Sequence, residues 1–409
     1  MKRLFLVLAL AALAIGNAAA QKKIPETVNL LSNSTRRVEI ILPQVNGLNI
    51  YKADLHTHSI YSDAELTPEQ RVREAWLDGL DIFSMTDHVE YRRHEPTMLK
   101  FLKGYNGGKA KRAVNYNVIR KPATEAGMMA DLNIPTQLAQ KAAKGYGESM
   151  LIIPGCEITR EPKTIGHFNA LFTTDNNAIY DVDPMQSLRN ARKQGALITQ
   201  NHPGWSRKNC NITEFEQAAF DEGLIDGVEI MNGVSFYPKA MQRCIDKKLY
   251  MLACTDVHRE TNTYRNCGVF RTMTFVFAKE NTLKAVRKAL EKRMTLAYCA
   301  GNIAGDTKLL EDFFKASVSC KFLSRTKKNS TYALTNTTSI GYKLRVGRST
   351  LELPPFQTIT VTVGKTKEGK DRDVELYVAN MWEVGYKNPK IVYKAAPNKE
   401  KNKDNKEKK

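Results

Sequence analysis

Six of the seven histidines in this sequence stand in short motifs near aspartate or glutamate, and such motifs are typical of metal sites. His56 and His58 are two residues apart, so on an extended strand both imidazoles would point to one face and could reach one ion. The other candidate ligands are four histidines and three acidic residues: Asp63, His88, Glu157, His167, His202, Asp256 and His258. Imidazole and carboxylate together suit Zn, Mn or Fe better than Ca or Mg. The sequence therefore predicts a multinuclear centre of divalent transition metals.

Most of these candidates follow a short apolar segment that is predicted to be a strand. The segments at 80–85, 151–154, 196–199 and 250–254 precede His88, Glu157, His202 and the Asp256–His258 pair. A single histidine after a strand is more often a surface or core residue than a ligand. The recurrence at several strand ends favours the metal site, because α/β barrels assemble their active sites at the carboxyl ends of the strands.

Helices are predicted between these strands from their start and stop signals. Thr67, Pro68 and Gln70 form a capping box with proline at the first helical position, and Asp183 and Asn281 are predicted to cap two later helices. Alternating strands and helices predict a mainly parallel sheet, either closed as a barrel or open. Beyond residue 306 the pattern changes to short β-type runs at 332–335, 342–346, 358–363 and 374–378, which predict a small all-β domain.

The order of the motifs resembles the PHP (polymerase and histidinol phosphatase) family over about residues 50–302. The matching positions are His56-x-His58, Asp63, Thr86-Asp87-His88, Gly155-x-Glu157, His167, Asn201-His202-Pro203 and Asp256-x-His258. The resemblance implies a distorted (β/α)7 TIM-like barrel with a trinuclear centre, so two to three Zn, Mn or Fe ions are expected. Many relatives have histidine where this chain has Asp63, and aspartate is also a competent ligand.

The resemblance also implies how the ligands are shared. His56, His58, Glu157 and Asp256 would bind one metal, and Glu157 would bridge to a second that His167 and His202 also bind. Asp63, His88 and His258 would hold the third. Glu157, Asp63 and His258 are accordingly the candidate catalytic residues.

The function that this implies is hydrolysis of a small phosphate ester, such as a nucleotide or a sugar phosphate. Clustered cations lower the pKa of bound water, and the resulting hydroxide would attack phosphorus in line. Three arginines near the motifs, Arg160, Arg207 and Arg259, are candidates for binding the phosphate, although an arginine in such a position is more often an ordinary solvated or ion-paired surface residue. Trp205 is either part of the pocket wall or ordinary packing, and Asp87 either orients His88 or caps a turn.

Two alternatives stay open on the sequence alone. The same site could hydrolyse amides or carboxylic esters, or the chain could be a binding protein whose metals are structural. The intact ligand set argues against the second alternative.

Charge, cysteines and the chain ends complete the domain predictions. Residues 1–20 have a basic start, an apolar run and a small-residue end, which predict a cleaved signal peptide and a periplasmic or extracellular protein; an uncleaved anchor is the alternative. The net charge of +19 is spread over scattered lysines, without a nucleic-acid motif or a later membrane span, so an anionic small molecule is the expected partner and the oligomeric state is left open.

Residues 21–305 are predicted to form the metallohydrolase domain with an insertion at about 89–150 over its mouth, residues 306–395 a β-sandwich-like domain that braces it, and residues 396–409 a Lys-rich disordered tail. Seven cysteines leave disulfides possible, with Cys210, Cys244 and Cys267 as candidates.

Overall fold

The structure is a computed structural model that describes residues 26–27, 36–92, 94 and 131–397. The chain divides into a unit that ends at Arg36 and a second unit, Arg37–Lys409, which contains every element described below. The predicted signal peptide, residues 398–409 of the predicted tail and residues 95–130 of the predicted insertion lie outside the described residues.

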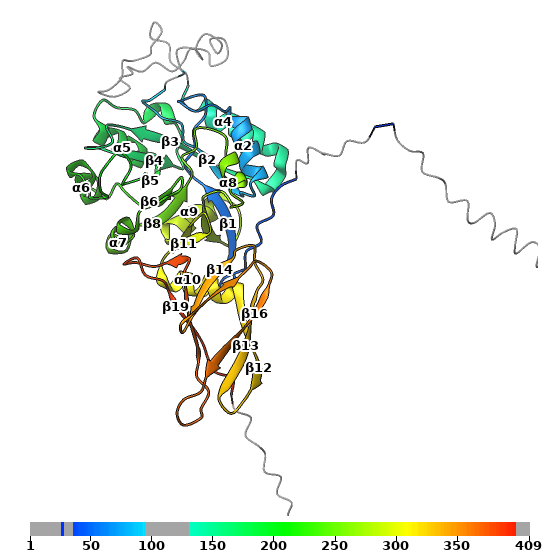
Figure 1. Cartoon of the computed structure of the whole chain (residues 1–409). Helices are drawn as coiled ribbons and strands as arrows, with labels where there is room; N and C mark the ends of the chain where they lie inside the picture. The colour runs from blue at the N-terminus through cyan, green and yellow to red at the C-terminus, as the bar shows by residue number, and fades with distance from the viewer. Residues whose placement is uncertain (1–25, 28–35, 93, 95–130, 398–409) are drawn as a thin grey trace, which may run out of the picture. The chain divides into compact units, whose positions relative to one another are not determined.

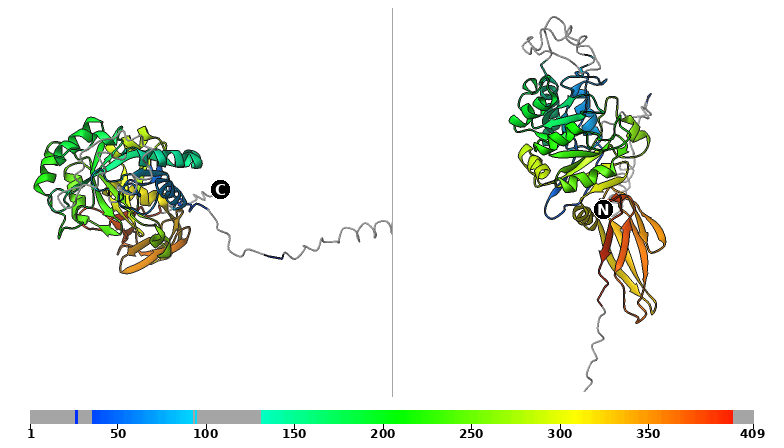
Figure 2. Two further views of the ribbon diagram at one scale, coloured as in Figure 1. Left: turned by 90° about the horizontal axis from the view of Figure 1, so that it is seen from above. Right: turned by 90° about the vertical axis from the view of Figure 1, so that its left-hand side faces the viewer.

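The second unit is built on one large curled sheet with helices on its outside (Figures 1 and 2). Its strands are β1 (Asn49–Asp54), β2 (Ile82–Met85), β3 (Leu151–Thr159), β4 (His167–Leu171), β5 (Leu197–Gln200), β6 (Gly227–Asn232), β7 (Ser235–Phe236), β8 (Tyr250–Cys254), β9 (Met273–Ala278), β10 (Thr295–Cys299) and β11 (Asn302–Gly305). The order is β11-β10-β9-β1-β2-β3-β4-β5-β6-β7, and β8 pairs with β6. The curl brings β8 against β9 and β10, so the strands enclose a barrel core. The predicted distorted TIM-like barrel is confirmed.

The sheet is mixed and not wholly parallel. β1, β2 and β3 pair in parallel, as do β5, β6 and β8, whereas β4 is antiparallel to both β3 and β5. Only a short connection separates β3 from β4, and a parallel crossover needs a dozen or more residues. The strand that begins at His167 therefore runs against its neighbours.

The helices begin largely where the capping signals predict. They are α2 (Pro68–Leu77), α4 (Ile134–Ala143), α5 (Pro184–Lys193), α6 (Glu214–Asp221), α7 (Pro238–Asp246), α8 (Asn262–Asn266) and α9 (Leu283–Glu291). Thr67 forms the predicted capping box, and Asp183 caps α5. The prediction for Asn281 is wrong, because Thr282 accepts the hydrogen bond from the Ala285 amide, while the Asn281 side chain donates to the Asp81 carbonyl.

The described part of the predicted insertion belongs to the barrel wall. Residues 134–149 form α4 and a 3-10 helix, and α4 packs against α2 and β3 (Figure 1). The helix lies in sequence between the parallel strands β2 and β3, so it is the crossover that joins them. Residues 131–150 therefore cover the outside of the sheet.

The C-terminal domain consists of α10 (Thr307–Ser317) and two small antiparallel sheets. One sheet has the order β12 (Val318–Arg325), β13 (Asn329–Asn336), β16 (Thr358–Gly364); the other has the order β15 (Ser349–Leu353), β14 (Tyr342–Val346), β17 (Val374–Val378), β19 (Lys390–Tyr393). The predicted all-β domain is confirmed. It also returns one short strand, β18 (Met381–Trp382), to pair in parallel with β11 of the barrel.

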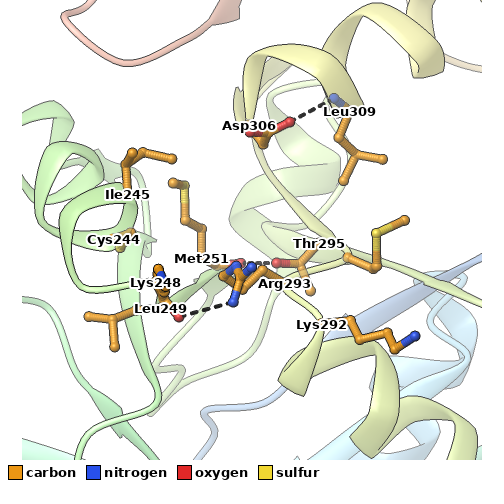
Figure 3. A pocket seen from close by; sticks show the side chains of 11 residues that line it. Cys244, Ile245, Lys248, Leu249, Met251, Lys292, Arg293, Thr295, Asp306 and Leu309 are labelled. Atoms are coloured by element: carbon orange, nitrogen blue, oxygen red, sulfur yellow. Dashed lines mark hydrogen bonds between the residues drawn. The ribbon is translucent and has the colours of Figure 1, made fainter.

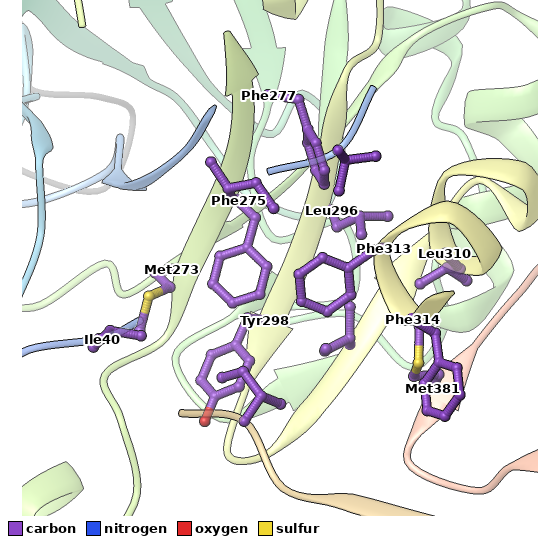
Figure 4. Close-up of a cluster of buried hydrophobic side chains, with 14 of the residues drawn as sticks. Ile40, Met273, Phe275, Phe277, Leu296, Tyr298, Leu310, Phe313, Phe314 and Met381 are labelled. Atoms are coloured by element: carbon purple, nitrogen blue, oxygen red, sulfur yellow. The ribbon is translucent and has the colours of Figure 1, made fainter. Parts of the chain in front are cut away.

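One hydrophobic core runs through both domains (Figure 4). The Phe313 ring of α10 lies 5.7 Å from Phe275 and 6.4 Å from Phe277, both on barrel strand β9. On the same helix, Phe314 packs edge-on against Tyr342 of the C-terminal domain, with ring centroids 4.9 Å apart. Helix α10 thus bridges the domains, which supports the predicted bracing role.

Two remaining sequence questions concern membranes and disulfides. Among the described residues, the structure contains no helix long and apolar enough to cross a bilayer. All seven cysteines are described, and none of the candidates Cys210, Cys244 and Cys267 is paired in the structure.

Replacing Phe313 with alanine should destabilise both domains together. The ring is fully buried between two phenylalanines, and its removal leaves a cavity that costs about 3–5 kcal/mol. Denaturant unfolding followed by tryptophan fluorescence measures the loss. Phe356, a phenylalanine that is 56% exposed, is the matched control, and Phe356→Ala should change the free energy of unfolding by about 0.5 kcal/mol or less. Equal effects of the two variants would contradict a shared core.

Candidate metal centre

The structure brings all nine candidate ligands together at one end of the barrel. His56 and His58 follow β1, His88 follows β2, His202 follows β5, and Asp256 and His258 follow β8. Glu157 lies inside β3 and not after it, because this strand continues past Pro154 to pair with β4. His167 is the first residue of β4, and since β4 is antiparallel its amino end lies at the same edge of the sheet.

Glu157 lies at the centre of the cluster. Its Oε1 atom is 3.3 Å from His56 Nε2, 3.3 Å from His167 Nδ1 and 3.7 Å from His202 Nε2. Its Oε2 atom is 2.5 Å from His88 Nδ1 and 3.8 Å from His58 Nε2. One buried carboxylate thus faces five imidazoles, as a bridging ligand would.

Three overlapping groups within the cluster have ligand atoms close enough to hold an ion, all within 4.8 Å of one another. They are His58, Asp63, His88 and His258; His56, Glu157 and His202; and His56, His58 and Asp256. The first group coincides with the set implied for a third metal, with His58 added. His167 lies in none of the groups, although it faces Glu157.

The contacts inside these groups suit a cation. His56 Nε2 lies 3.0 Å from His58 Nε2, and both nitrogens lie within 3.3 Å of Asp256 Oδ1. His58 Nδ1 is buried and makes no hydrogen bond among the described residues; Asp63 Oδ1 is buried too, and it faces His258 Nε2 at 3.2 Å and His88 Nε2 at 3.3 Å. Buried polar atoms without such partners are costly, and a metal ion would satisfy these atoms together. The residues present therefore fit a metal centre.

The electrostatics keep His58 and the carboxylates in their metal-binding form. In contrast, although burial opposes protonation of His56 and His88, the neighbouring carboxylates outweigh it and raise the pKa of both imidazoles, that of His88 to about 10. Burial lowers the pKa of His58 to about 4, with the neighbouring His88 and His258 adding to the effect, so this imidazole is neutral. Burial opposes ionisation of Asp63, but the adjacent His88 and His258 outweigh it and hold the pKa of this carboxyl well below its usual range. Burial likewise opposes ionisation of Asp256 and Glu157, whose pKa values the surrounding histidines lower. Neutral imidazoles and charged carboxylates are the forms that bind metals.

Several side chains around the ligands hold them in place, and Glu229 is the most prominent. Its Oε1 atom accepts a hydrogen bond at 2.7 Å from His56 Nδ1, which leaves Nε2 free to bind, and its Oε2 atom accepts from the His202 amide. The sequence predictions did not include Glu229. Its signal was nevertheless present, because a lone acidic residue in the apolar strand β6 must find a partner when buried.

Other outer contacts fix individual ligands. The Asn201 side chain donates to Glu157 Oε1 at 2.8 Å, and the His167 Nε2 atom lies 3.1 Å from the Arg160 carbonyl, so its Nδ1 faces the cluster. Thr159 Oγ1 donates to Glu157 Oε2 at 3.1 Å and also contacts His88 Nδ1. Asp87 accepts hydrogen bonds from the Ser59 amide and hydroxyl, so it anchors the loop after His58.

Two candidate ligands have left-handed backbone conformations. His202 has φ of 23° and Asp256 has φ of 53°, which non-glycine residues rarely adopt. The Asp256 amide donates to the His56 carbonyl at 2.9 Å, and the His202 amide is held by Glu229. Strain of this kind is found at functional sites where the surroundings over-determine the backbone.

The three predicted phosphate-binding arginines each have a protein partner. Arg160 is buried, paired with Glu90, and donates to the Asp181 carbonyl and Ser187. Arg207 forms a two-pronged pair with Glu216, and Arg259, whose side chain is 83% exposed, lies 3.2 Å from Glu65. Their contact with substrate stays a prediction.

A separate cavity of about 330 Å³ lies at the other end of the barrel strands (Figure 3). It is lined by Met251 near the start of β8 and Thr295 at the start of β10, together with Lys248, Lys292, Arg293 and Asp306. None of the nine candidate ligands contributes to it. The ligand cluster at the carboxyl ends of the strands, and not this cavity, is therefore the predicted site.

Comparison with solved structures identifies the fold family. A two-domain protein from Bacteroides vulgatus that contains a predicted PHP-like metal-dependent phosphoesterase is 33% identical, matches 88% of this chain and 100% of its own, and superposes with a TM-score of 0.74. The chain belongs to this PHP-like family. The predicted resemblance is confirmed, and with it the assignment to the metal-dependent hydrolases.

Two other solved structures are far less similar. An amidohydrolase from Chromobacterium violaceum is 14% identical, with 51% of this chain and 88% of its own matched and a TM-score of 0.34. A lesion-specific endonuclease from Pyrococcus furiosus is 17% identical, with 63% and 59% matched and a TM-score of 0.36. Scans against protein-family models and curated proteins gave no match. These distant likenesses carry no functional argument for the PHP-like chain.

Changing Glu229 to glutamine should weaken metal binding without unfolding the protein. The amide cannot hold the His56 Nδ1 proton as the carboxylate does, and loss of such outer contacts typically costs 10–100-fold in metal affinity. Competition with a chelator of known affinity, read by elemental analysis, measures the change. Glu222→Gln removes an exposed carboxylate that pairs with Arg189 and is the matched control. Wild-type affinity in Glu229→Gln would contradict the outer-contact role.

Proposed function

We propose that this protein hydrolyses small phosphate esters at the nine-residue centre, with two to three Zn, Mn or Fe ions bound. The observation that carries the proposal is the Glu157 carboxylate, buried among five imidazoles where it can bridge two ions. Divalent ions at such a centre supply an activated water and neutralise the charge of a phosphoryl group. The family relationship supports the same chemistry.

The candidate ligands differ in how deeply they are buried. Glu157, His56 and His58 are fully buried and fix the inner part of the centre. Asp63 and His258 lie toward the mouth: the His258 side chain is 37% exposed and its Nε2 atom lies 3.2 Å from Asp63 Oδ1. His258 and Asp256, whose side chain is 21% exposed, are the candidate ligands most accessible to solvent, because the remaining candidate histidines are each less than 10% exposed.

The metal-loaded protein should release phosphate from p-nitrophenyl phosphate or cleave its bis ester, and chelation should abolish the activity. Glu157→Ala should lose both activity and bound metal, because one carboxylate serves several ligands. Glu222→Ala is the control, since Glu222 is exposed and distant in sequence from every ligand. Elemental analysis and a phosphate-release assay measure the two quantities.

The same experiment separates the alternatives. Cleavage of carboxylic esters or amides without any cleavage of phosphate esters would favour the other hydrolase chemistry. Full metal content with no hydrolysis of any of these substrates would favour a binding protein. Unchanged metal content in Glu157→Ala would refute the central assignment.

We further propose that the protein is exported, on the signal-like residues 1–20. In a bacterial expression host the mature protein should begin at Gln21 and fractionate with periplasmic or secreted proteins. Amino-terminal sequencing of the fractionated protein tests both points. An intact Met1 start in the soluble cytoplasmic fraction would contradict export.

A further inference from the structure

The cavity at the amino ends of the barrel strands combines an apolar floor with a cationic rim (Figure 3). The buried side chains of Leu249, Met251 and Leu309 line its floor. Its volume of about 330 Å³ falls within the range of small-molecule sites, which is about 300–1,000 Å³. The cavity is therefore large enough for a small ligand with an apolar body.

The rim of this cavity carries three cationic residues and one acidic residue. The cations are Lys248, Lys292 and Arg293, which are exposed and make no ion pair with any residue that the structure describes. The acidic residue, Asp306, caps α10 by accepting a hydrogen bond from the Leu309 amide at 3.0 Å. Three positive charges and one negative charge leave the rim at +2, which favours an anionic ligand.

Two of these cations have an unusual backbone conformation. Lys248 has φ of 57° and Arg293 has φ of 58°, and each occupies the left-handed position of the turn that ends a helix, α7 or α9. The same turn ends helices α2, α5, α6 and α8, where the left-handed residue is glycine: Gly79, Gly195, Gly223 and Gly268. Glycine is the usual residue there because a Cβ atom strains this conformation. The chain therefore accepts strain at the two positions whose side chains line the cavity.

Neither helix needs these two side chains in order to end. A cation near the carboxyl end of a helix is favourable, but Lys247 at the end of α7 and Lys292 at the end of α9 already supply one. The turns are also closed by the backbone, because the Leu249 and Met294 amides donate back to helix carbonyls at 2.8 and 2.9 Å. The charged side chains at the left-handed positions thus call for another explanation.

The two loops that carry these side chains meet at the cavity. Arg293 Nη1 donates to the Lys248 carbonyl at 3.5 Å, so the loop before β10 touches the loop before β8 (Figure 3). This one long contact leaves most of the five guanidinium donors without an acceptor among the described residues. The donors of a guanidinium form a fork that matches the two oxygens of a carboxylate. A carboxylate at Arg293 would lie beside Lys248 as well.

We propose that this cavity binds a small organic acid, with its carboxylate at Arg293 and Lys248 and its apolar body on the buried floor. The cationic rim selects an anion and the floor selects an apolar body, so neither a neutral alcohol nor a bare inorganic anion satisfies both. This is a second ligand site, at the end of the barrel strands opposite the metal centre. It does not depend on the proposed phosphoesterase activity.

The test measures the binding of octanoate to the metal-loaded protein by titration calorimetry. The buffer contains excess acetate, which occupies open positions on the metals but lacks an apolar body. The wild-type protein should bind octanoate at least about tenfold more tightly than it binds 1-octanol or inorganic phosphate. Arg293→Gly should bind octanoate at least about tenfold more weakly than wild type, because hydrogen bonds to a charged group are lost. Arg293→Lys keeps the charge and should retain more of the affinity.

Thermal unfolding of the same variants separates a ligand-binding role from a structural one. Arg293→Gly introduces the residue that the turn prefers, so its melting temperature should equal or exceed that of wild type while its octanoate affinity falls. Arg293→Gln keeps a side chain at the strained position and should lose the affinity without a gain in stability. Lys327→Gln removes one exposed cation from the C-terminal domain and is the control, with octanoate affinity unchanged.

Several outcomes would overturn the proposal. Equal octanoate affinity in wild type and Arg293→Gly would do so, as would the absence of octanoate binding by wild type. Tighter binding of inorganic phosphate than of octanoate would refute the role of the apolar floor. An equal loss of affinity in Lys327→Gln would reduce the effect to net charge. A lower melting temperature in both Arg293→Gly and Arg293→Gln would show that the side chain is structural.

Discussion

The structure of the site depends on one buried carboxylate. Glu157 faces imidazoles that come from β1, β2, β4 and β5 or the loops after them, so segments far apart in the sequence meet at its two oxygens. A charge in this position is tolerable only because cations or protonated histidines surround it, and burying it otherwise would be very costly. The strand that carries Glu157 passes through the middle of the sheet and is anchored on both sides by its neighbours. The barrel therefore fixes the carboxylate, and the carboxylate fixes the spacing of the ligands.

Much of this arrangement was predictable from the sequence because its signals are local. The His-x-His pair, the apolar runs before His88 and His202, and the capping residues of α2 and α5 each depend on a few adjacent residues. The nine candidate ligands were named from such patterns, and the structure places all of them in one cluster. Strand β8 and strand β14 were located to the residue by their composition.

The features that were missed depend on contacts between distant segments. The antiparallel direction of β4 follows from the length of its connection to β3, which the residue types alone do not reveal. Glu229 acquires its role only when β6 lies beside the loop that carries His56. The helix cap at Thr282 was assigned to its neighbour, because two residues with capping side chains stand next to each other and only the backbone geometry decides between them. The apparent insertion contained the crossover helix α4, which a long intervening segment concealed.

The strand β18 makes the barrel sheet depend on a segment of the C-terminal domain. It consists of Met381 and Trp382, late in the chain, yet it completes the edge of the barrel sheet beside β11. During synthesis the first three hundred residues emerge while that edge, and the barrel face that packs on Phe313, still lack their partners. The edge of the barrel sheet is therefore completed only by residues near the end of the chain. A gene fragment cut at the domain boundary would leave a bare strand edge and an aromatic surface that the intact protein never presents to solvent.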